Sequence, residues 1–162
     1  MLIWTMIAAL IVVLDQLTKY FVMTKIGAHN VIHAIPGLFD FVYVKNTGAA
    51  FSILSESTGL LGIVSVIFCL GVLAYWYLKK PEHILMKTSL TFLFAGALGN
   101  AIDRVFRGYV VDFIETAFMD FPVFNVADIA ITFGAAIMVI YIIFFDKDEK
   151  DGETDSFRIK SE

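Results

Sequence analysis

Apolar residues gather into four stretches, each close to the length of a membrane-spanning helix. Such a helix needs ~20 consecutive, predominantly apolar residues to cross the hydrocarbon core of a bilayer. The four stretches cover residues 2–23, 59–78, 84–102 and 121–145, and the second carries no charged residue. The pattern therefore predicts a single integral membrane domain over residues 1–145, built as an all-α bundle of four transmembrane helices.

The composition excludes the ordinary classes of soluble protein. Hydrophobic residues make up 59% of the chain and charged residues 17%, whereas soluble domains carry about 45–50% and about 25%. A soluble core of this size has no room for so many large apolar side chains, so the excess must face lipid. The single cysteine, Cys69, excludes an internal disulfide. The sequence has no stripe of basic residues, so a nucleic-acid partner is not expected.

Charged residues are concentrated at the C-terminal end of the chain. Residues 146–162 hold seven of the 16 acids and four of the 12 bases, which leaves nine acids and eight bases in residues 1–145. Interspersed charges without an apolar face are typical of a solvated and disordered segment. We therefore expect residues 146–162 to form a disordered tail.

Two connecting segments differ from simple loops. Residues 31–32 and 39–45 are rich in β-branched and aromatic residues and are flanked by Pro-Gly and Thr-Gly pairs, which predicts short strands with turns. Residues 108–120 have a similar character. We expect a small extracytoplasmic β-sheet cradle on the membrane surface and, starting within residues 49–54, a short interfacial helix.

The distribution of lysine and arginine orients the four spans. Residues 79–87 contain three lysines and residues 146–162 contain four bases, and with four spans both segments lie on the same side. Because cytoplasmic loops are enriched in Lys and Arg, both termini are expected in the cytoplasm. Residues 24–58 and 104–120 are then expected outside. No partner chain is indicated, and a monomer is expected.

Several polar residues interrupt the apolar spans, where a charge costs a few kcal/mol to insert. Asp15 and Lys19 are four residues apart and can pair on one face of the first helix. With the predicted orientation, the remaining polar residues lie at the same depth as this pair, near the outer face of the membrane. These are Asn100, Asp103 and Arg104 in the third span, Asn125 and Asp128 in the fourth, and Asp112 in the outer segment between them.

Most of these residues also have a purely structural explanation. Asp15 and Lys19 can form a structural ion pair, because intramembrane charges pair with one another. Arg104 can anchor a helix end to lipid headgroups, and Asp103 can hold Arg104 or cap a helix. The Asn-Thr-Gly sequence at 46–48 alone indicates only a turn.

Asp112 and Asp128 are harder to explain structurally, because too few bases lie nearby in the sequence to pair with both. If they face each other, repulsion makes them share a proton, as in aspartic proteases. A small proton-coupled transporter would also use intramembrane acids, but near the midplane, and a structural subunit would need no paired acids. No metal site is expected, because His29, His33 and His83 are scattered over loops on both sides of the membrane and show no metal-ligand spacing.

Five short blocks that follow one another along the chain identify a family. With these blocks the sequence resembles the bacterial lipoprotein signal peptidases, also called signal peptidase II, over essentially the whole chain up to the tail. The blocks are DQLTK (15–19), NTGAAF (46–51), GNAIDR (99–104), VDFI (111–114) and FNVAD (124–128).

The resemblance implies an aspartic endopeptidase of the bacterial cytoplasmic membrane. Its substrate would be a prolipoprotein that already carries diacylglycerol on the lipobox cysteine, and it would cut on the N-terminal side of that cysteine. The implied partners are this diacylated prolipoprotein and membrane lipid, and no cofactor or metal would be needed. The implied fold is four transmembrane helices with a small β-sheet cradle and a short surface helix.

The resemblance also assigns expected roles to individual residues. The catalytic pair carries over to Asp112 and Asp128. We expect Asn100 and Asn125 to orient these carboxylates by hydrogen bonds, and Asn46 to hold the substrate backbone.

The remaining motif residues are expected to assist. Arg104 would hold the substrate backbone together with Asn46, and Asp103 would orient Arg104. Asp15, Lys19 and Gly48 would support the site.

Overall fold

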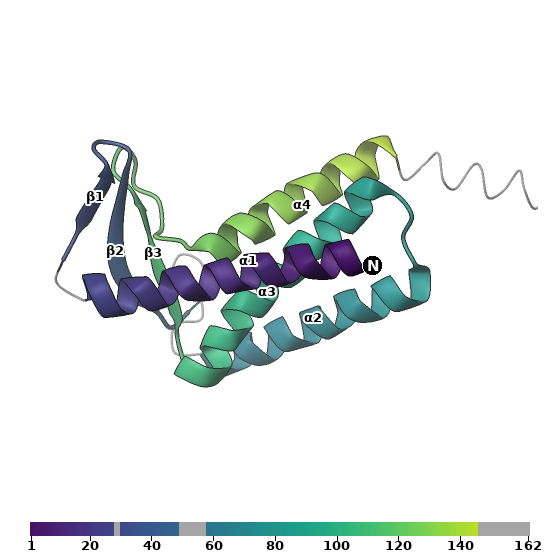
Figure 1. Ribbon diagram of the computed structural model, residues 1–162, viewed down its shortest axis with the longest axis horizontal. Coiled ribbons are helices and arrows are strands. Elements are labelled where there is room, and N and C mark those ends of the chain that lie inside the picture. The colour runs from purple at the N-terminus through teal and green to yellow at the C-terminus, as the bar shows by residue number, and fades with distance from the viewer. Residues whose placement is uncertain (28–29, 49–57, 146–162) are drawn as a thin grey trace, which may run out of the picture.

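The computed structural model describes residues 1–27, 30–48 and 58–145, which form four helices and one small sheet (Figure 1). The expected interfacial helix beginning in residues 49–54, the expected tail at 146–162 and His29 lie outside the described residues. The four helices are long and apolar enough to cross a membrane. The predicted fold class, a membrane bundle of four helices with a small sheet, is confirmed for the described part of the chain.

The first two helices lie close to their predicted bounds. Helix α1 spans Leu2–Phe21 and continues into a π-helical turn, Val22–Ile26, which Gly27 ends with a φ of 62°. Helix α2 spans Thr58–Lys79. Both stretches lack internal proline and present mostly apolar residues, so their helices form wherever the surroundings cannot hydrogen-bond the backbone.

The other two helices differ from the prediction at their outer ends. Helix α3 spans Ile84–Arg107 and continues five residues past the predicted end, to Gly108, which adopts the left-handed conformation that ends helices. Helix α4 spans Val126–Phe144 and begins five residues later than predicted. Asn125 caps it, and the preceding Phe124 is extended and pairs with Ile114 of the sheet. Residues 121–124 are apolar and line a cavity next to the beginning of α4. Hydropathy alone could not separate this segment from the helix that follows it.

Helix α3 is the central element of the bundle. It contacts each of the other three helices, and ten of its 24 residues are buried. Its contact with α4 is close, because a Cβ on Gly134 would lie 2.9 Å from Cγ of Leu93. Ser89 donates to the carbonyl oxygen of Gly134 across the same contact, at 2.8 Å.

The sheet lies at one end of the bundle, beside the end of α1, the end of α3 and the beginning of α4 (Figure 1). Its strands β1 (Ile32–Ile35), β2 (Phe39–Asn46) and β3 (Val110–Thr116) pair antiparallel in the order β1-β2-β3. Apolar side chains of β3 pack against the π-helical turn, forming a small core of Val22, Ile26, Val111 and Phe113. The sheet therefore fixes β3 against the end of α1.

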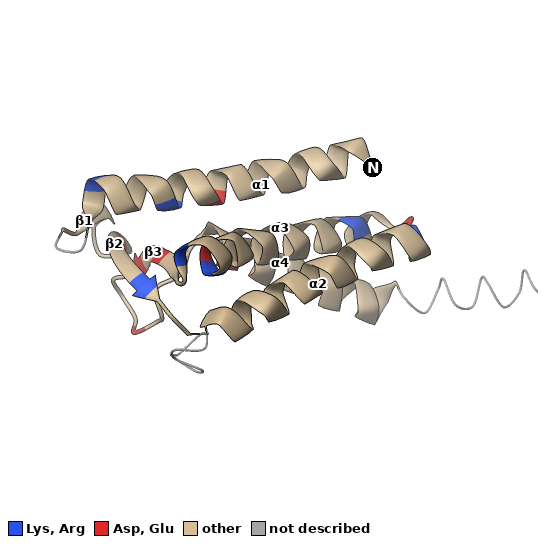
Figure 2. Ribbon diagram, turned by 90° about the horizontal axis from the view of Figure 1, so that it is seen from below, with Lys and Arg blue, Asp and Glu red and all other residues tan. Residues whose placement is uncertain are grey.

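Charged residues gather at the two ends of the bundle. Figure 2 shows long uncharged helix surfaces between the sheet end, where Asp, Glu, Lys and Arg cluster, and a smaller set of charges at the opposite end. Large apolar side chains are exposed along α1, α2 and α4, including Leu10, Ile63, Ile67, Phe133 and Ile142. Such a band is what a lipid environment requires of a helix surface.

Candidate active site

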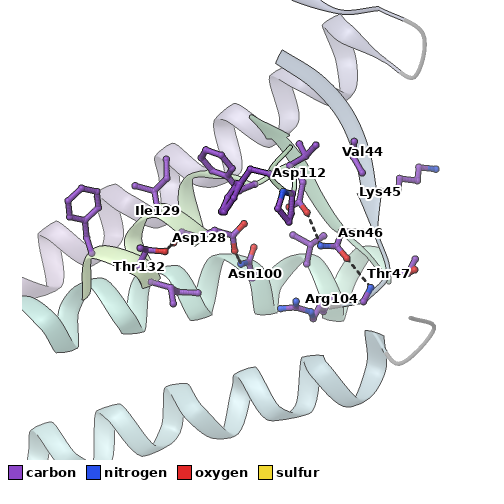
Figure 3. A pocket seen from close by; sticks show the side chains of 18 residues that line it. Val44, Lys45, Asn46, Thr47, Asn100, Arg104, Asp112, Asp128, Ile129 and Thr132 are labelled. Atoms are coloured by element: carbon purple, nitrogen blue, oxygen red, sulfur yellow. Dashed lines mark hydrogen bonds between the residues drawn. The ribbon is translucent and has the colours of Figure 1, made fainter. Parts of the chain in front are cut away.

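A cavity of about 720 Å³ opens at the sheet end, between β2, β3, α3 and the start of α4. Six of the predicted site residues line it, and Figure 3 shows the side chains of five of them, which its labels identify. These six are Asn46, Gly48, Asn100, Arg104, Asp112 and Asp128. The other four predicted residues, Asp15, Lys19, Asp103 and Asn125, are fully buried next to them. Segments far apart in the sequence are therefore brought to one place.

Asp112 projects from β3 and is almost fully buried, with 3% of its surface exposed. Asn46 of β2 donates to Oδ2 at 2.8 Å, and Asn125 donates to Oδ1 at 2.7 Å. Burial and, after it, the charge of Asp128 raise the pKa of Asp112 to about 6, although the two amide hydrogen bonds and the charge of Lys19 oppose the rise. A carboxyl group in this setting can hold a proton near neutral pH.

Asp128 lies in the first turn of α4 and is half-buried at the wall of the cavity. Its Oδ2 accepts from the backbone N–H of Asn125 at 3.1 Å, and its own N–H donates to Oδ1 of Asn125 at 3.0 Å. This reciprocal capping box fixes the start of α4. Oδ1 of Asp128 accepts from Nδ2 of Asn100 at 2.8 Å.

Asn125 joins the two carboxyl groups. Its Nδ2 donates to Asp112 while its Oδ1 caps the helix that carries Asp128. Both acids therefore accept hydrogen bonds from Asn125, Asp112 from its side-chain amide and Asp128 from its backbone N–H. Two acids that line one cavity in this way can hold one proton between them and can polarise a water molecule or a carbonyl group. This arrangement is suited to general acid–base chemistry.

Lys19, Asp15 and Asp103 form what we call the buried ion cluster, and none of the three has any exposed surface. Nζ of Lys19 lies 2.9 Å from Oδ2 of Asp15, 3.0 Å from Oδ2 of Asp103 and 2.9 Å from Oδ1 of Asn100. The lysine therefore uses all three of its N–H donors. The ion pair predicted between Asp15 and Lys19 is present, and it includes a second carboxylate.

The predicted contact between Asp103 and Arg104 is absent: in the part of the chain that the structure describes, no hydrogen bond or ion pair joins the two side chains. The carboxylate of Asp103 faces α1 and accepts from Lys19, while Arg104 points to the cavity and to α2. Consecutive side chains on a helix point about 100° apart, so these two residues reach different neighbours. Nη1 of Arg104 lies 3.5 Å from Oγ of Ser65, and among the described residues its Nε has no hydrogen-bond partner.

Two residues in the network were not predicted, Gln16 and Arg107. Nε2 of Gln16 donates to Asp15 at 3.1 Å and to Asp103 at 3.2 Å, and its Oε1 accepts from Nη1 of Arg107 at 3.0 Å. Arg107 also pairs with Asp103. The spacing of Arg107 four residues after Asp103 was a usable signal, but the third span was expected to end before it.

Asn46 was expected to hold the substrate backbone. Its Nδ2 donates to Asp112 and its Oδ1 accepts from the N–H of Gly48 at 2.9 Å, which leaves one of its two N–H donors for another partner. The described histidines lie apart from the site. His33 pairs with Asp40 on the sheet, and His83 caps α3 at the far end. Over residues 1–27, 30–48 and 58–145, no three His, Cys, Asp or Glu side chains are grouped to hold a metal ion.

The sequence profile of one protein family, described as signal peptidase (SPase) II, matches residues 7–144. A lipoprotein signal peptidase of Enterococcus faecalis is 38% identical to the chain over 153 residues, which is 94% of this chain and 95% of that protein. A lipoprotein signal peptidase of Symbiobacterium thermophilum is 39% identical over 145 residues, or 87% and 94% of the two chains.

Two solved structures are also similar to this chain in fold and in sequence. A bacterial membrane enzyme determined by the in meso method superposes with a TM-score of 0.82 at 35% identity, covering 86% of this chain and 87% of that one. A second such enzyme gives a TM-score of 0.79 at 35% identity, covering 88% and 93%. At this identity the likeness extends to the sequence as well as to the fold.

Proposed function

The chain belongs to the signal peptidase II family, and from this premise we propose that it is an aspartic endopeptidase that removes signal peptides from diacylglyceryl-modified prolipoproteins. The proposed cut lies on the N-terminal side of the lipidated cysteine. The observation that carries the proposal is the convergence of Asp112 and Asp128 on one cavity, with Asn125 bound to both.

In the proposed mechanism the two acids share one proton. The ionised carboxylate takes a proton from a water molecule held between the pair, and the water attacks the scissile carbonyl carbon. The protonated carboxyl group polarises the carbonyl oxygen, so a tetrahedral diol forms. The diol collapses as a proton passes to the leaving nitrogen. Asn46, Asn100 and Asn125 would hold the two carboxyl groups in place throughout.

Arg104 is the proposed contact to the substrate backbone. It lines the cavity, and its guanidinium makes only one long hydrogen bond within the described residues. A guanidinium offers paired donors that suit a peptide carbonyl. The exposed apolar helix surfaces beside the cavity would let the acyl chains stay in lipid while the peptide bond reaches the acids.

A transporter is less well supported than a peptidase. Transport by intramembrane acids needs a site near the midplane that can be reached from both faces. The candidate acids lie at the sheet end of the bundle, in a cavity built partly from strands.

The proposal is tested with the purified protein in detergent and a synthetic lipobox peptide, prepared with and without diacylglycerol on its cysteine. Mass spectrometry should find a single cut before the cysteine in the diacylated peptide, and little cutting of the unlipidated control. A chelator should leave the rate unchanged. Loss of activity with the chelator, or a cut elsewhere, would contradict the proposed chemistry.

The pH dependence should reflect the Asp112 carboxyl group. Burial and the charge of Asp128 together raise the pKa of this group from the ordinary value of 3.8 to about 6, so the shared proton persists to a higher pH than it would on an exposed aspartate. We expect the alkaline limb of kcat/KM at pH 6 or above. An alkaline limb below pH 5 would show that the buried acid is not needed in its protonated form.

The proposed orientation puts the sheet and the cavity outside and both termini in the cytoplasm. Lysines at 79, 80 and 87 support it, since such loops stay in the cytoplasm. In a Cys69→Ala background, a membrane-impermeant thiol reagent should label Lys45→Cys in intact cells and Lys80→Cys only after permeabilisation. The reverse pattern would invert the topology.

A further inference from the structure

The buried ion cluster of Lys19, Asp15 and Asp103 lies next to both candidate catalytic acids but touches neither of them directly. It holds a cation and two carboxylates without exposed surface, and Arg107 pairs with Asp103 to balance the charge. Replacing such a buried ion group by apolar residues is often neutral or stabilising. Fold stability alone is therefore a weak explanation for it, and its other contacts are informative.

Each carboxylate of the cluster binds the backbone directly before one of the candidate catalytic acids. Oδ1 of Asp15 accepts from the N–H of Ala127 at 2.9 Å, and Ala127 precedes Asp128. Oδ2 of Asp103 accepts from the N–H of Val111 at 3.2 Å, and Val111 precedes Asp112. One cluster therefore holds the main chain of α4 and of β3 at equivalent positions.

Lys19 adds a third link, through Asn100. An ammonium group can only donate, so the oxygen of the Asn100 amide must face Lys19. The amide nitrogen then has to face Oδ1 of Asp128, which it contacts at 2.8 Å. The lysine thus determines which end of Asn100 meets the acid.

Helix α3 leaves room for this arrangement at Gly99. A Cβ at this position would lie 2.6 Å from Oδ2 of Asp15 and 3.2 Å from Cβ of Ala127. Any larger residue would push the Asp15 carboxylate away from Lys19 and from the N–H of Ala127. The GNAIDR block therefore contributes a glycine that the cluster needs, alongside Asn100 and Asp103.

We propose that Lys19, Asp15 and Asp103 are positioning residues that set the separation and orientation of Asp112 and Asp128, by binding the peptide N–H before each acid and by fixing Asn100. The proposal rests on the proposed function, because it assumes that these two acids perform the chemistry. A small misplacement of reacting groups can lower a rate about 100-fold. The cluster should therefore act on kcat and leave substrate binding nearly intact.

Two variants disturb the cluster in different ways. Gly99→Ala displaces the Asp15 carboxylate without changing any charge, and Lys19→Met removes the cation and releases Asn100. Ser89→Ala is the matched control, since it removes a buried hydrogen bond between the same two helices, from near the beginning of α3 to the middle of α4 and outside the network around the acids. All are assayed on the diacylated peptide, with the melting temperature in detergent measured for each.

We expect kcat to fall about 10-fold in Gly99→Ala and about 100-fold in Lys19→Met, with KM within about 3-fold of the wild-type value. Ser89→Ala should keep the wild-type kcat even where its melting temperature falls as much as that of Gly99→Ala. Wild-type kcat in a folded Gly99→Ala or Lys19→Met would overturn the proposal. The proposal would also be overturned if neither variant accumulated in the membrane while Ser89→Ala accumulated normally, because the cluster would then be needed for folding alone.

The same experiment separates this inference from the proposed function. If the wild-type protein does not cut the diacylated peptide, the proposed function fails. If the wild-type protein cuts it, replacement of either acid abolishes cutting, and the two cluster variants keep the wild-type kcat, only the positioning role fails.

Discussion

Helices α2 and α3 are neighbours of similar length, yet they serve different purposes. Four of the 22 residues of α2 are buried, against ten of the 24 residues of α3. The buried set of α3 includes Ser89, Thr91, Asn100 and Asp103, whereas that of α2 has only the Thr58 hydroxyl and the weakly polar Cys69 thiol. Protein surrounds α3, so its polar groups find partners that lipid could not supply.

Helix α2 lies against the candidate site beside Arg104 of α3. A Cβ on Gly62 of α2 would lie 3.3 Å from Cβ of Arg104, and one turn further on, Ser65 lies 3.5 Å from Nη1 of the same arginine. Helix α2 thus supplies a wall beside Arg104, and α3 supplies the functional groups. We therefore predict that single substitutions of buried site residues on α3 lower turnover much more than single substitutions on α2.

The largest of these effects is expected at Asn100, at the centre of the network on α3. Asn100→Ala leaves the ammonium of Lys19 and a carboxylate oxygen of Asp128 each without one partner. Because a small misplacement of a reacting group can lower a rate about 100-fold, kcat should fall by about that factor. Steady-state kinetics on the diacylated peptide measure this.

Thr91→Ala is the control on the same helix, because Thr91 is buried but bonds only to its own helix, at the carbonyl oxygen of Lys87. Its kcat should stay close to the wild-type value. Equal losses in both variants would mean that α3 is sensitive as a whole, and that Asn100 has no special connection to the acids.

Arg104→Lys is expected to have the next largest effect, at the contact between the two helices. Lysine keeps the charge and can reach the membrane surface equally well, but it cannot reproduce the paired donors of the guanidinium. Turnover should fall about 10-fold, with little change in the melting temperature in detergent. Near-wild-type kinetics would instead make Arg104 an anchor of the helix end at the lipid headgroups.

The smallest effect is expected on α2. Cys69 is buried against α3, where its thiol lies 4.0 Å from the carbonyl oxygen of Phe94. Cys69→Ala removes a small apolar group and should cost about 1 kcal/mol of stability, with kcat/KM within about 2-fold of the wild-type value. A loss of activity above about 10-fold would show that α2 also transmits effects to the acids.

The fold was largely predictable because its signals are local. Span length appears directly in hydropathy, and the alternation in residues 39–45 indicated β2. The start of α4 was misplaced because the apolar residues 121–124 line the cavity and precede the helix, which Asn125 caps. Hydropathy cannot distinguish a lipid-facing turn from a segment that covers a cavity.

The residues of the candidate site were predictable as a group, but their pairings were not. Helical spacing correctly placed Asn100, Asp103 and Arg104 near one another. It could not indicate that α1 lies against Asp103 while α2 and the cavity lie against Arg104. The link from Gln16 to Arg107 was likewise invisible, because it joins residues 91 positions apart. Which neighbour faces which side chain is decided by packing.

The central claim is that Asp112 and Asp128 act as one catalytic unit. The most direct test measures kcat for Asp112→Asn, for Asp128→Asn and for the double variant on the diacylated peptide. Groups that work as a unit are strongly non-additive. We predict that each single variant falls below a few per cent of wild-type turnover and that the double variant is no slower than either. Substantial turnover in one single variant, or losses that multiply in the double variant, would contradict the account.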